Sequence, residues 1–226
     1  MSRKTTVLIN VLIALMVAAA WCMMLFRTDG NGALSVRGFG SLRYFTVLSN
    51  LAEGAAAGCC AVAVGSRLRT GREGVPAWTV TFRFIAAAST ALTFLTVTFF
   101  LGPLYGFATM YAGANFFFHL IVPLTAAAAF CLDGQGEDVP FRATLPAVLP
   151  MAAYGAFYLG NNLIRGIGPD TDWYGFLNWG WPTGLIIFAV LMMMTWGAAV
   201  CLRALRIHAR RRLARRASAE RNGQNF

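Results

Sequence analysis

Long apolar segments dominate the pattern of hydrophobic and polar positions along the chain. Each is about 20 residues long, the length that an α-helix needs to cross a hydrocarbon core of roughly 30 Å. The expected membrane-spanning helices are 6–26, 44–64, 80–101, 110–131, 143–161 and 182–202. Charged and turn-forming residues separate them, as between antiparallel helices. The pattern therefore predicts an all-α fold: a polytopic six-helix transmembrane bundle over residues 1–202, followed by an Arg-rich tail over 203–226.

The composition agrees with this fold and adds an orientation. Hydrophobic residues make up 58% of the chain and charged residues only 12%, which leaves no room for a separate soluble catalytic domain. With the N-terminus inside, 15 of the 19 basic residues fall on the inner side of the predicted bundle and four on the outer side. Because cytoplasmic segments carry the excess of Lys and Arg, both termini should be cytoplasmic.

The tail at 203–226 carries eight of the arginines. A basic segment next to a membrane helix binds anionic lipid head groups, and this is the partner that we expect for it, besides the bilayer itself. Nucleic acid is not expected, because no aromatic side chains alternate with the arginines to stack on bases. The sequence has no CxxC motif and only two histidines, so it predicts no metal site and no cofactor.

Polar residues inside the predicted spans are informative, because a bilayer disfavours buried polar groups. The second helix carries four of them at i, i+3, i+4 and i+7: Thr46, Ser49, Asn50 and Glu53. This spacing places all four on one helical face. Hydrogen bonds between helices are the simplest role for the first three. A hydrogen bond between helices is not enough to explain Glu53, since a carboxyl group at that depth must be protonated, paired with a cation or hydrated in a cavity.

The fourth helix adds Asn115 and His119, one turn apart. His119 is the one imidazole inside the predicted spans, and it is either a packing residue or a functional base. As a general base it could activate a hydroxyl nucleophile, Thr46 or Ser49. Asn50, Asn115 and Ser49 are the candidates to bind an oxyanion or to orient the substrate.

The fifth helix and the loop after it supply a second polar and aromatic set. Tyr158 and Asn161 share one face of the helix, and the loop 162–181 is rich in Gly, Trp and Asn. Trp173 and Tyr174 in this loop fit either an interfacial aromatic belt or contacts with a ligand. The sequence leaves both alternatives open.

Four runs in this order resemble a known family: RYFTVLSNL at 43–51, NFFFHLIVPL at 115–124, and YGAFYLGNNLIRG and DWYGFLNWG in the last third. They are similar to the FAR-type androgen-induced membrane proteins and their bacterial six-helix relatives. Animal members of that family are multi-pass proteins that hydrolyse fatty acid esters of hydroxy fatty acids with a threonine and a histidine inside the membrane. The resemblance implies that Thr46 is the nucleophile and His119 the base.

Two positions depart from the family pattern. Gly175 stands where a proline is expected, and Pro123 follows His119 by four residues instead of five.

The resemblance extends to the bacterial relatives, so it implies a bacterial plasma-membrane protein. The residues expected to contact the substrate are Arg43, Glu53, Tyr158, Asn161, Trp173 and Tyr174.

The expected function is an integral-membrane lipid ester hydrolase that admits a fatty-acyl ester from the bilayer. Acyl transfer to a lipid alcohol would use the same residues. The alternative from another class is a non-enzymatic lipid-binding protein or transporter, in which Glu53 and His119 form a proton relay. A structural scaffold is the third possibility.

The orientation can be tested at the loop 162–181. In a variant without the natural cysteines, a cysteine introduced at Asp170 should react with a membrane-impermeant maleimide added from outside the cell, because the charge bias puts this loop outside. Labelling only after the cytoplasmic face is exposed would reverse the topology.

Overall fold

The computed structural model describes residues 1–26, 38–71, 74–136 and 138–223. These residues are predominantly helical and contain no strand. Among them, six stretches are long and apolar enough to cross a membrane: Arg3–Phe26, Phe45–Thr70, Ala77–Tyr105, Ala114–Leu132, Phe141–Arg165 and Trp181–Arg215. The predicted all-α, six-span membrane fold is therefore confirmed at this level. Arg27, Arg37 and Arg72, which entered the charge count, lie outside the described residues.

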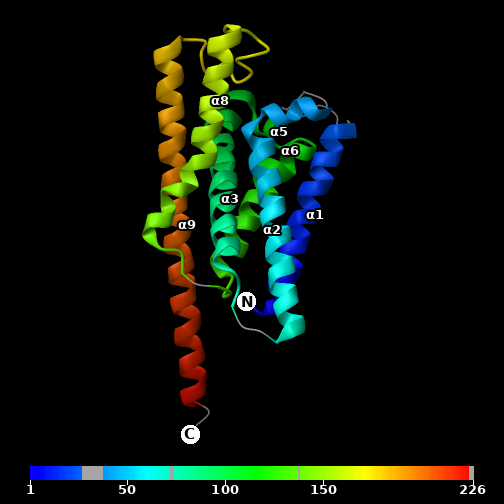
Figure 1. Cartoon of the computed structure of the whole chain (residues 1–226), viewed down its shortest axis with the longest axis vertical. Helices are drawn as coiled ribbons and strands as arrows, with labels where there is room; N and C mark the ends of the chain where they lie inside the picture. Colours follow the sequence, from blue (N-terminus) through cyan, green and yellow to red (C-terminus); the bar gives the residue numbers. More distant parts are fainter. Residues whose placement is uncertain (27–37, 72–73, 137, 224–226) are drawn as a thin grey trace.

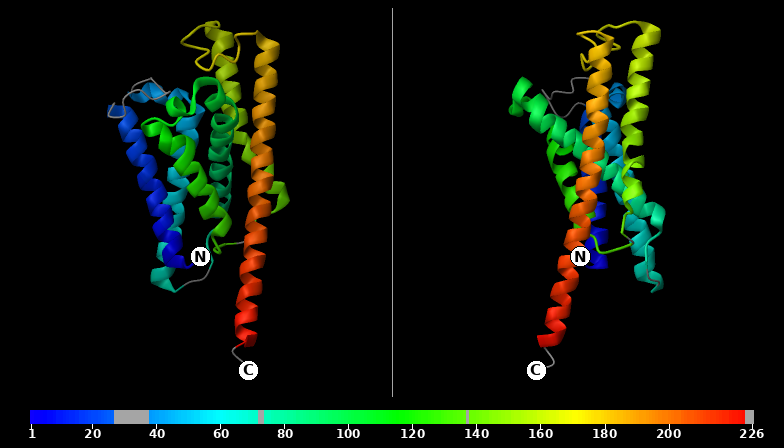
Figure 2. Two further views of the ribbon diagram at one scale, coloured as in Figure 1. Left: turned by 180° about the vertical axis from the view of Figure 1, so that it is seen from behind. Right: turned by 90° about the vertical axis from the view of Figure 1, so that its left-hand side faces the viewer.

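The spans run alternately up and down, and both ends of the chain lie at the same end of the bundle (Figure 1). We call this the terminal end, and the opposite one the loop end. The main helices are α1 (Arg3–Phe26), α2 (Phe45–Thr70), α3 (Ala77–Thr96), α7 (Val122–Leu132), α8 (Leu149–Arg165) and α9 (Trp181–Gly223). Helix α1 packs along α2, and α3 lies between α2, α7 and α9. The two rotated views show α9 reaching far beyond the other helices at the terminal end (Figure 2).

Short elements connect the spans. They are the 3-10 helices η1 (Gly38–Arg43), η4 (Phe141–Thr144) and η5 (Pro146–Val148), the π-helical segments η2 (Val97–Leu101) and η3 (Phe117–Ile121), and the helical turns α4 (Gly102–Tyr105), α5 (Phe107–Met110) and α6 (Ala114–Phe116). Segments η2 and α4 continue α3, and η3 joins α6 to α7. The third and fourth spans are thus composite helices.

Large apolar side chains cover the outside of the bundle. Leu8, Phe99, Ile164 and Met193 are more than half exposed. The centre holds smaller groups: alanines of α2, α3 and α7, with Phe84, Phe118 and Phe130 between them. Apolar residues outside and closely packed small residues inside are the arrangement that a bilayer favours.

Two prolines explain the two π-helical segments. Pro103 and Pro123 have no backbone N–H, and inside an α-helix their rings would collide with the carbonyl groups of Phe99 and His119. The helix widens just before each of them: Gly102 N–H donates to the Val97 carbonyl and Val122 N–H to the Phe117 carbonyl, both five residues back. A wider turn of this type is frequent at functional sites.

Glycines make the fourth span begin later than predicted. The prediction began this helix at residue 110, whereas its first regular turn, α6, begins at Ala114. Gly106 has φ 87° and ψ 130°, and Gly113 has φ 56° and ψ −133°. L-residues rarely adopt such positive φ values. The chain therefore folds back between α4 and α6, and His119 lies closer to the loop end than a helix from residue 110 would place it.

Glu53 and Arg83 form an ion pair inside the bundle. The Arg83 Nη1 atom donates to Glu53 Oε1 at 2.5 Å, and both side chains are buried. As predicted, Glu53 is bonded to a neighbouring helix. Arg83, which the sequence assigned to the cytoplasmic charges, instead lies inside the protein, because a carboxylate in an apolar core needs a cation.

Helix α9 continues past residue 202, without a break, through Gly223. Three of its arginines bind the segment that follows α7. Arg206 donates to the carbonyls of Phe130 and Gln135, and Arg203 to that of Val139. Arg210 donates to the carbonyl of Gly136 and to the carboxylate of Asp138. These three arginines share one helical face and are not free to bind lipid head groups.

The ion pair should stabilise the fold as a unit. Glu53→Leu or Arg83→Met alone leaves an unpaired buried charge and should cost about 3–5 kcal/mol of unfolding free energy. The double variant should recover most of this loss, because no buried charge remains. Chemical unfolding in detergent measures all three variants, and a double variant as unstable as the sum of the singles would contradict the pairing.

Candidate functional site

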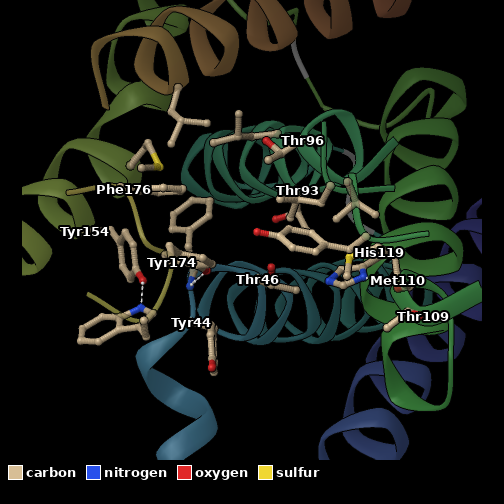
Figure 3. A pocket seen from close by; sticks show the side chains of 18 residues that line it. Tyr44, Thr46, Thr93, Thr96, Thr109, Met110, His119, Tyr154, Tyr174 and Phe176 are labelled. Carbon is tan, nitrogen blue, oxygen red and sulfur yellow. Dashed lines mark hydrogen bonds between the residues drawn. The ribbon is translucent and has the colours of Figure 1, made fainter. Parts of the chain in front are cut away.

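A cavity of about 420 Å³ lies near the loop end of the bundle. Its walls come from the first turn of α2, the second half of α3, the segments η2, α4, α5 and η3, the helices α8 and α9, and the loop segment 173–176 (Figure 3). Leu92, Val97, Leu101, Met151 and Leu191 make much of the surface apolar. Both Thr46 and His119 line it, so the two residues proposed for catalysis open into one apolar space.

Thr46 sits in the first turn of α2. The helix begins at Phe45, after the extended residue Tyr44. At such an end the first N–H groups have no partner within the helix. One of them, the N–H of Phe45, donates to the phenol oxygen of Tyr174 at 3.0 Å. The loop residue Tyr174 is thereby fastened beside the threonine.

His119 lies in the π-helical segment η3, four residues before Pro123. Its Nδ1 atom lies 2.6 Å from the backbone carbonyl of Met110. A carbonyl oxygen can only accept, so the proton of this hydrogen bond is on Nδ1. In the neutral ring Nε2 then keeps its lone pair, which suits a general base. The close-up shows Thr46 and His119 approaching the cavity from different helices (Figure 3).

Tyr174 places a phenol against the nucleophile candidate. Its oxygen accepts a hydrogen bond from the Phe45 N–H, and its side chain lines the cavity together with Thr46 and Tyr154. Burial raises the pKa of the Tyr174 phenol to about 12, although the hydrogen bond from Phe45 acts in the opposite direction. The phenol therefore keeps its proton at neutral pH and can donate it to an oxygen atom in the cavity.

Arg43 and Trp173 belong to an aromatic layer at the loop end. The Arg43 guanidinium lies 5.2 Å from the Tyr44 ring centre and 5.7 Å from that of Trp173. The phenol of Tyr154 donates to the Arg43 carbonyl and accepts from the Trp173 indole. Trp173 and Tyr174 line the cavity, whereas Arg43 does not. Trp179, by contrast, is 76% exposed and fits the interfacial belt.

The residues expected at an oxyanion lie elsewhere. The Asn50 amide donates to the carbonyls of Thr46 and Phe118, and the Ser49 hydroxyl contacts Thr46 O and the Thr93 hydroxyl. Asn115 is buried, and none of the three is among the described residues that line the cavity. Ser49 and Asn50 hold helices together, because their polar groups find partners on the adjacent spans.

Glu53 does not line the cavity either. Its bonded carboxylate oxygen faces Arg83 of α3, and no hydrogen bond joins it to His119 in the part of the chain that the structure describes. The geometry therefore gives no support to a Glu53–His119 proton relay. It also leaves Glu53 out of contact with anything that the cavity holds.

Tyr158 and Asn161, which were expected to contact the substrate, do not line the cavity either. Tyr158 is buried beneath the loop, and its phenol donates to the carboxylate of Asp172 instead of reaching the cavity. Asn162, and not Asn161, turns inward, where its amide donates to the carbonyls of Tyr158 and Thr171. The second Asp172 oxygen accepts the N–H of Leu177. These contacts shape the loop that carries Trp173 and Tyr174.

Several cavity residues escaped the sequence analysis. Thr93 and Thr96 of α3 and Thr109 and Met110 of α5 all line the cavity, and the sequence analysis singled out none of them. Thr93 and Thr96 are three residues apart, as are Thr46 and Ser49, so the pattern contained a signal for one polar face. Nothing in the sequence marks the Met110 carbonyl, because any residue would supply the same atom.

Comparison with known proteins adds no assignment. Among the described residues, no group of three or more His, Cys, Asp or Glu side chains could hold a metal ion. No family model, curated protein or solved structure matches this chain.

Proposed function

We propose that the protein is an integral-membrane hydrolase of fatty-acyl esters, with Thr46 as nucleophile and His119 as general base. The observation that carries the proposal is that both residues open into one apolar cavity while the Met110 carbonyl holds the proton of His119 on Nδ1. A nucleophile, a base and a group that orients the base are the three parts that such catalysis requires. Here a backbone carbonyl takes the place of the orienting carboxylate.

The reaction follows from these positions. The Thr46 oxygen attacks the acyl carbon while its proton passes to Nε2 of His119. The tetrahedral intermediate collapses, the C–O bond to the alcohol breaks, and His119 returns the proton to the departing oxygen. Water then attacks the threonine ester with His119 again as base, which releases the fatty acid and restores the Thr46 hydroxyl.

Tyr174 is the proposed oxyanion donor, in place of Asn50, Ser49 and Asn115. Its protonated phenol lies beside Thr46 and is held by the Phe45 N–H. A positioned donor stabilises the charge that develops on the carbonyl oxygen in the transition state. The low polarity of the cavity walls strengthens this interaction.

The site suits a substrate that enters from the bilayer. A cavity of about 420 Å³ is in the range of small-molecule sites and has mainly apolar walls, as an acyl chain requires. With cytoplasmic termini in a bacterial plasma membrane, it would open toward the outer leaflet. Transfer of the acyl group to a lipid alcohol uses the same first step, and product analysis with and without such an acceptor separates the two reactions.

Loss of either catalytic side chain should abolish turnover. Thr46→Ala and His119→Ala should each lower kcat for a long-chain p-nitrophenyl ester by at least about 10³-fold, and the double variant should be no worse than either single one, because members of one catalytic unit are not additive. A fluorophosphonate probe should label the wild-type protein at Thr46 and should not label Thr46→Ala.

Ser49→Ala and Thr96→Ala are the matched controls. The first removes a hydroxyl from the same face of α2 outside the cavity, and the second removes one from the cavity wall. Both should retain activity within a few-fold. Additive losses for Thr46 and His119, or labelling that persists in Thr46→Ala, would exclude this mechanism and favour a lipid-binding protein.

The role of Tyr174 predicts a separate effect. Tyr174→Phe removes the phenol but keeps the ring, so kcat should fall about 10²–10³-fold, as for the loss of one oxyanion donor, with little change in KM. Tyr105→Phe is the control, because this tyrosine also lines the cavity but lies on α4. Equal kinetics for Tyr174→Phe and the wild type would assign Tyr174 to the structure of the loop alone.

A further inference from the structure

A second hollow lies near the terminal end, between α7 and α9. It is a groove of about 470 Å³. Ala127 and Ala128 of α7 form one wall, and Leu202 and Leu205 of α9 the other. The alanines leave space because their side chains end at Cβ. This groove has no lining residue in common with the cavity of the proposed active site, so its function is independent of that proposal.

One end of the groove is basic. His208 and Arg212, one turn apart on α9, line it together with the apolar residues, and no acidic residue lines it. Both side chains are exposed, and no hydrogen bond or ion pair joins either to another residue within the described part of the chain. Arg203, Arg206 and Arg210 differ from them, because they are bonded to the segment after α7.

Two faces of α9 therefore differ in the role of their basic residues. Positions 203, 206 and 210 follow the 3–4 spacing of one face and bind carbonyl groups of the protein. Positions 205, 208, 209 and 212 follow the same spacing on another face and border the groove. A helix that needed its charges only for general attraction to a membrane would show no such division. Arg212 and His208, which have no partner within the described part of the chain, lie where the apolar groove ends.

We infer that this groove binds one anionic phospholipid, with an acyl chain against the apolar walls and the phosphate at Arg212 and His208. Apolar walls match the chain, and the basic end matches the head group. Basic pockets between helices at the cytoplasmic side of a membrane are sites for anionic lipid head groups. Two helices that border the bilayer present the groove directly to lipid, which is the solvent at that depth.

Spin-labelled lipids test the site in the full-length protein, reconstituted in phosphatidylcholine vesicles. Phosphatidylglycerol labelled on its acyl chain should be immobilised in preference to labelled phosphatidylcholine. One arginine near a membrane surface corresponds to about a five-fold change in association, so Arg212→Gln should lower the phosphatidylglycerol preference about five-fold. Arg211→Gln and Arg215→Gln remove exposed arginines that do not line the groove, and both should retain most of the preference.

A second variant separates the contribution of the apolar groove to lipid binding from the contribution of the positive charge. Ala128→Trp should fill the groove and release the immobilised lipid although every arginine remains. Equal effects of Arg211→Gln, Arg215→Gln and Arg212→Gln would show diffuse attraction and overturn the site, as would equal binding of the two lipids. A dimer that is present in the wild type and lost in Ala128→Trp would identify the occupant as a second copy of the chain and would also overturn it. None of these outcomes depends on esterase activity.

Discussion

The hydrogen bond between the His119 ring and the Met110 carbonyl, at 2.6 Å, is the interaction on which the rest of the site depends. It spans a stretch in which the chain leaves one composite helix, turns back at Gly106 and Gly113, and enters the next. A backbone carbonyl in an apolar environment needs a donor, and an imidazole needs a fixed proton to act as a base. One bond meets both requirements. The turn, the ring orientation and the free Nε2 atom are thus parts of one arrangement.

The two ends of the bundle handle polar groups differently. Inside the bundle and at the terminal end they are paired internally: Glu53 with Arg83, and the arginines of α9 with the carbonyls after α7. At the loop end the hydroxyls of Thr46, Thr93 and Thr96 border an open cavity. Closed pairing suits stability, because it gives hydrogen-bond partners to groups that are removed from water. Polar groups at a cavity are available for chemistry, which is why the proposed function is placed there.

The sequence predicted the spans because apolar runs of bilayer length have one interpretation. It could not predict their ends, which depend on local backbone conformation at Gly106 and Gly113 and on the contacts that extend α9. Periodicity correctly placed Thr46 and Ser49 on one face, but a face of a helix is wide enough to touch both a cavity and a neighbouring helix. The Asn50 amide therefore donates to the carbonyls of Thr46 and Phe118 and does not reach the cavity. The sequence pointed to Asn161, whereas Asn162 is the residue that turns inward, because its amide donates to the Thr171 carbonyl.

The π-helical segment η3 determines the direction in which the His119 ring points. Compared with an α-helix, a π turn contains one additional residue, and one residue corresponds to about 100° of rotation around the helix axis. The helix on either side of η3 can keep its packing while the ring of His119 points in a direction that a regular helix would not give it. The additional residue thus turns the His119 ring toward the cavity, while the buried neighbours Phe118 and Val122 stay within one hydrophobic cluster.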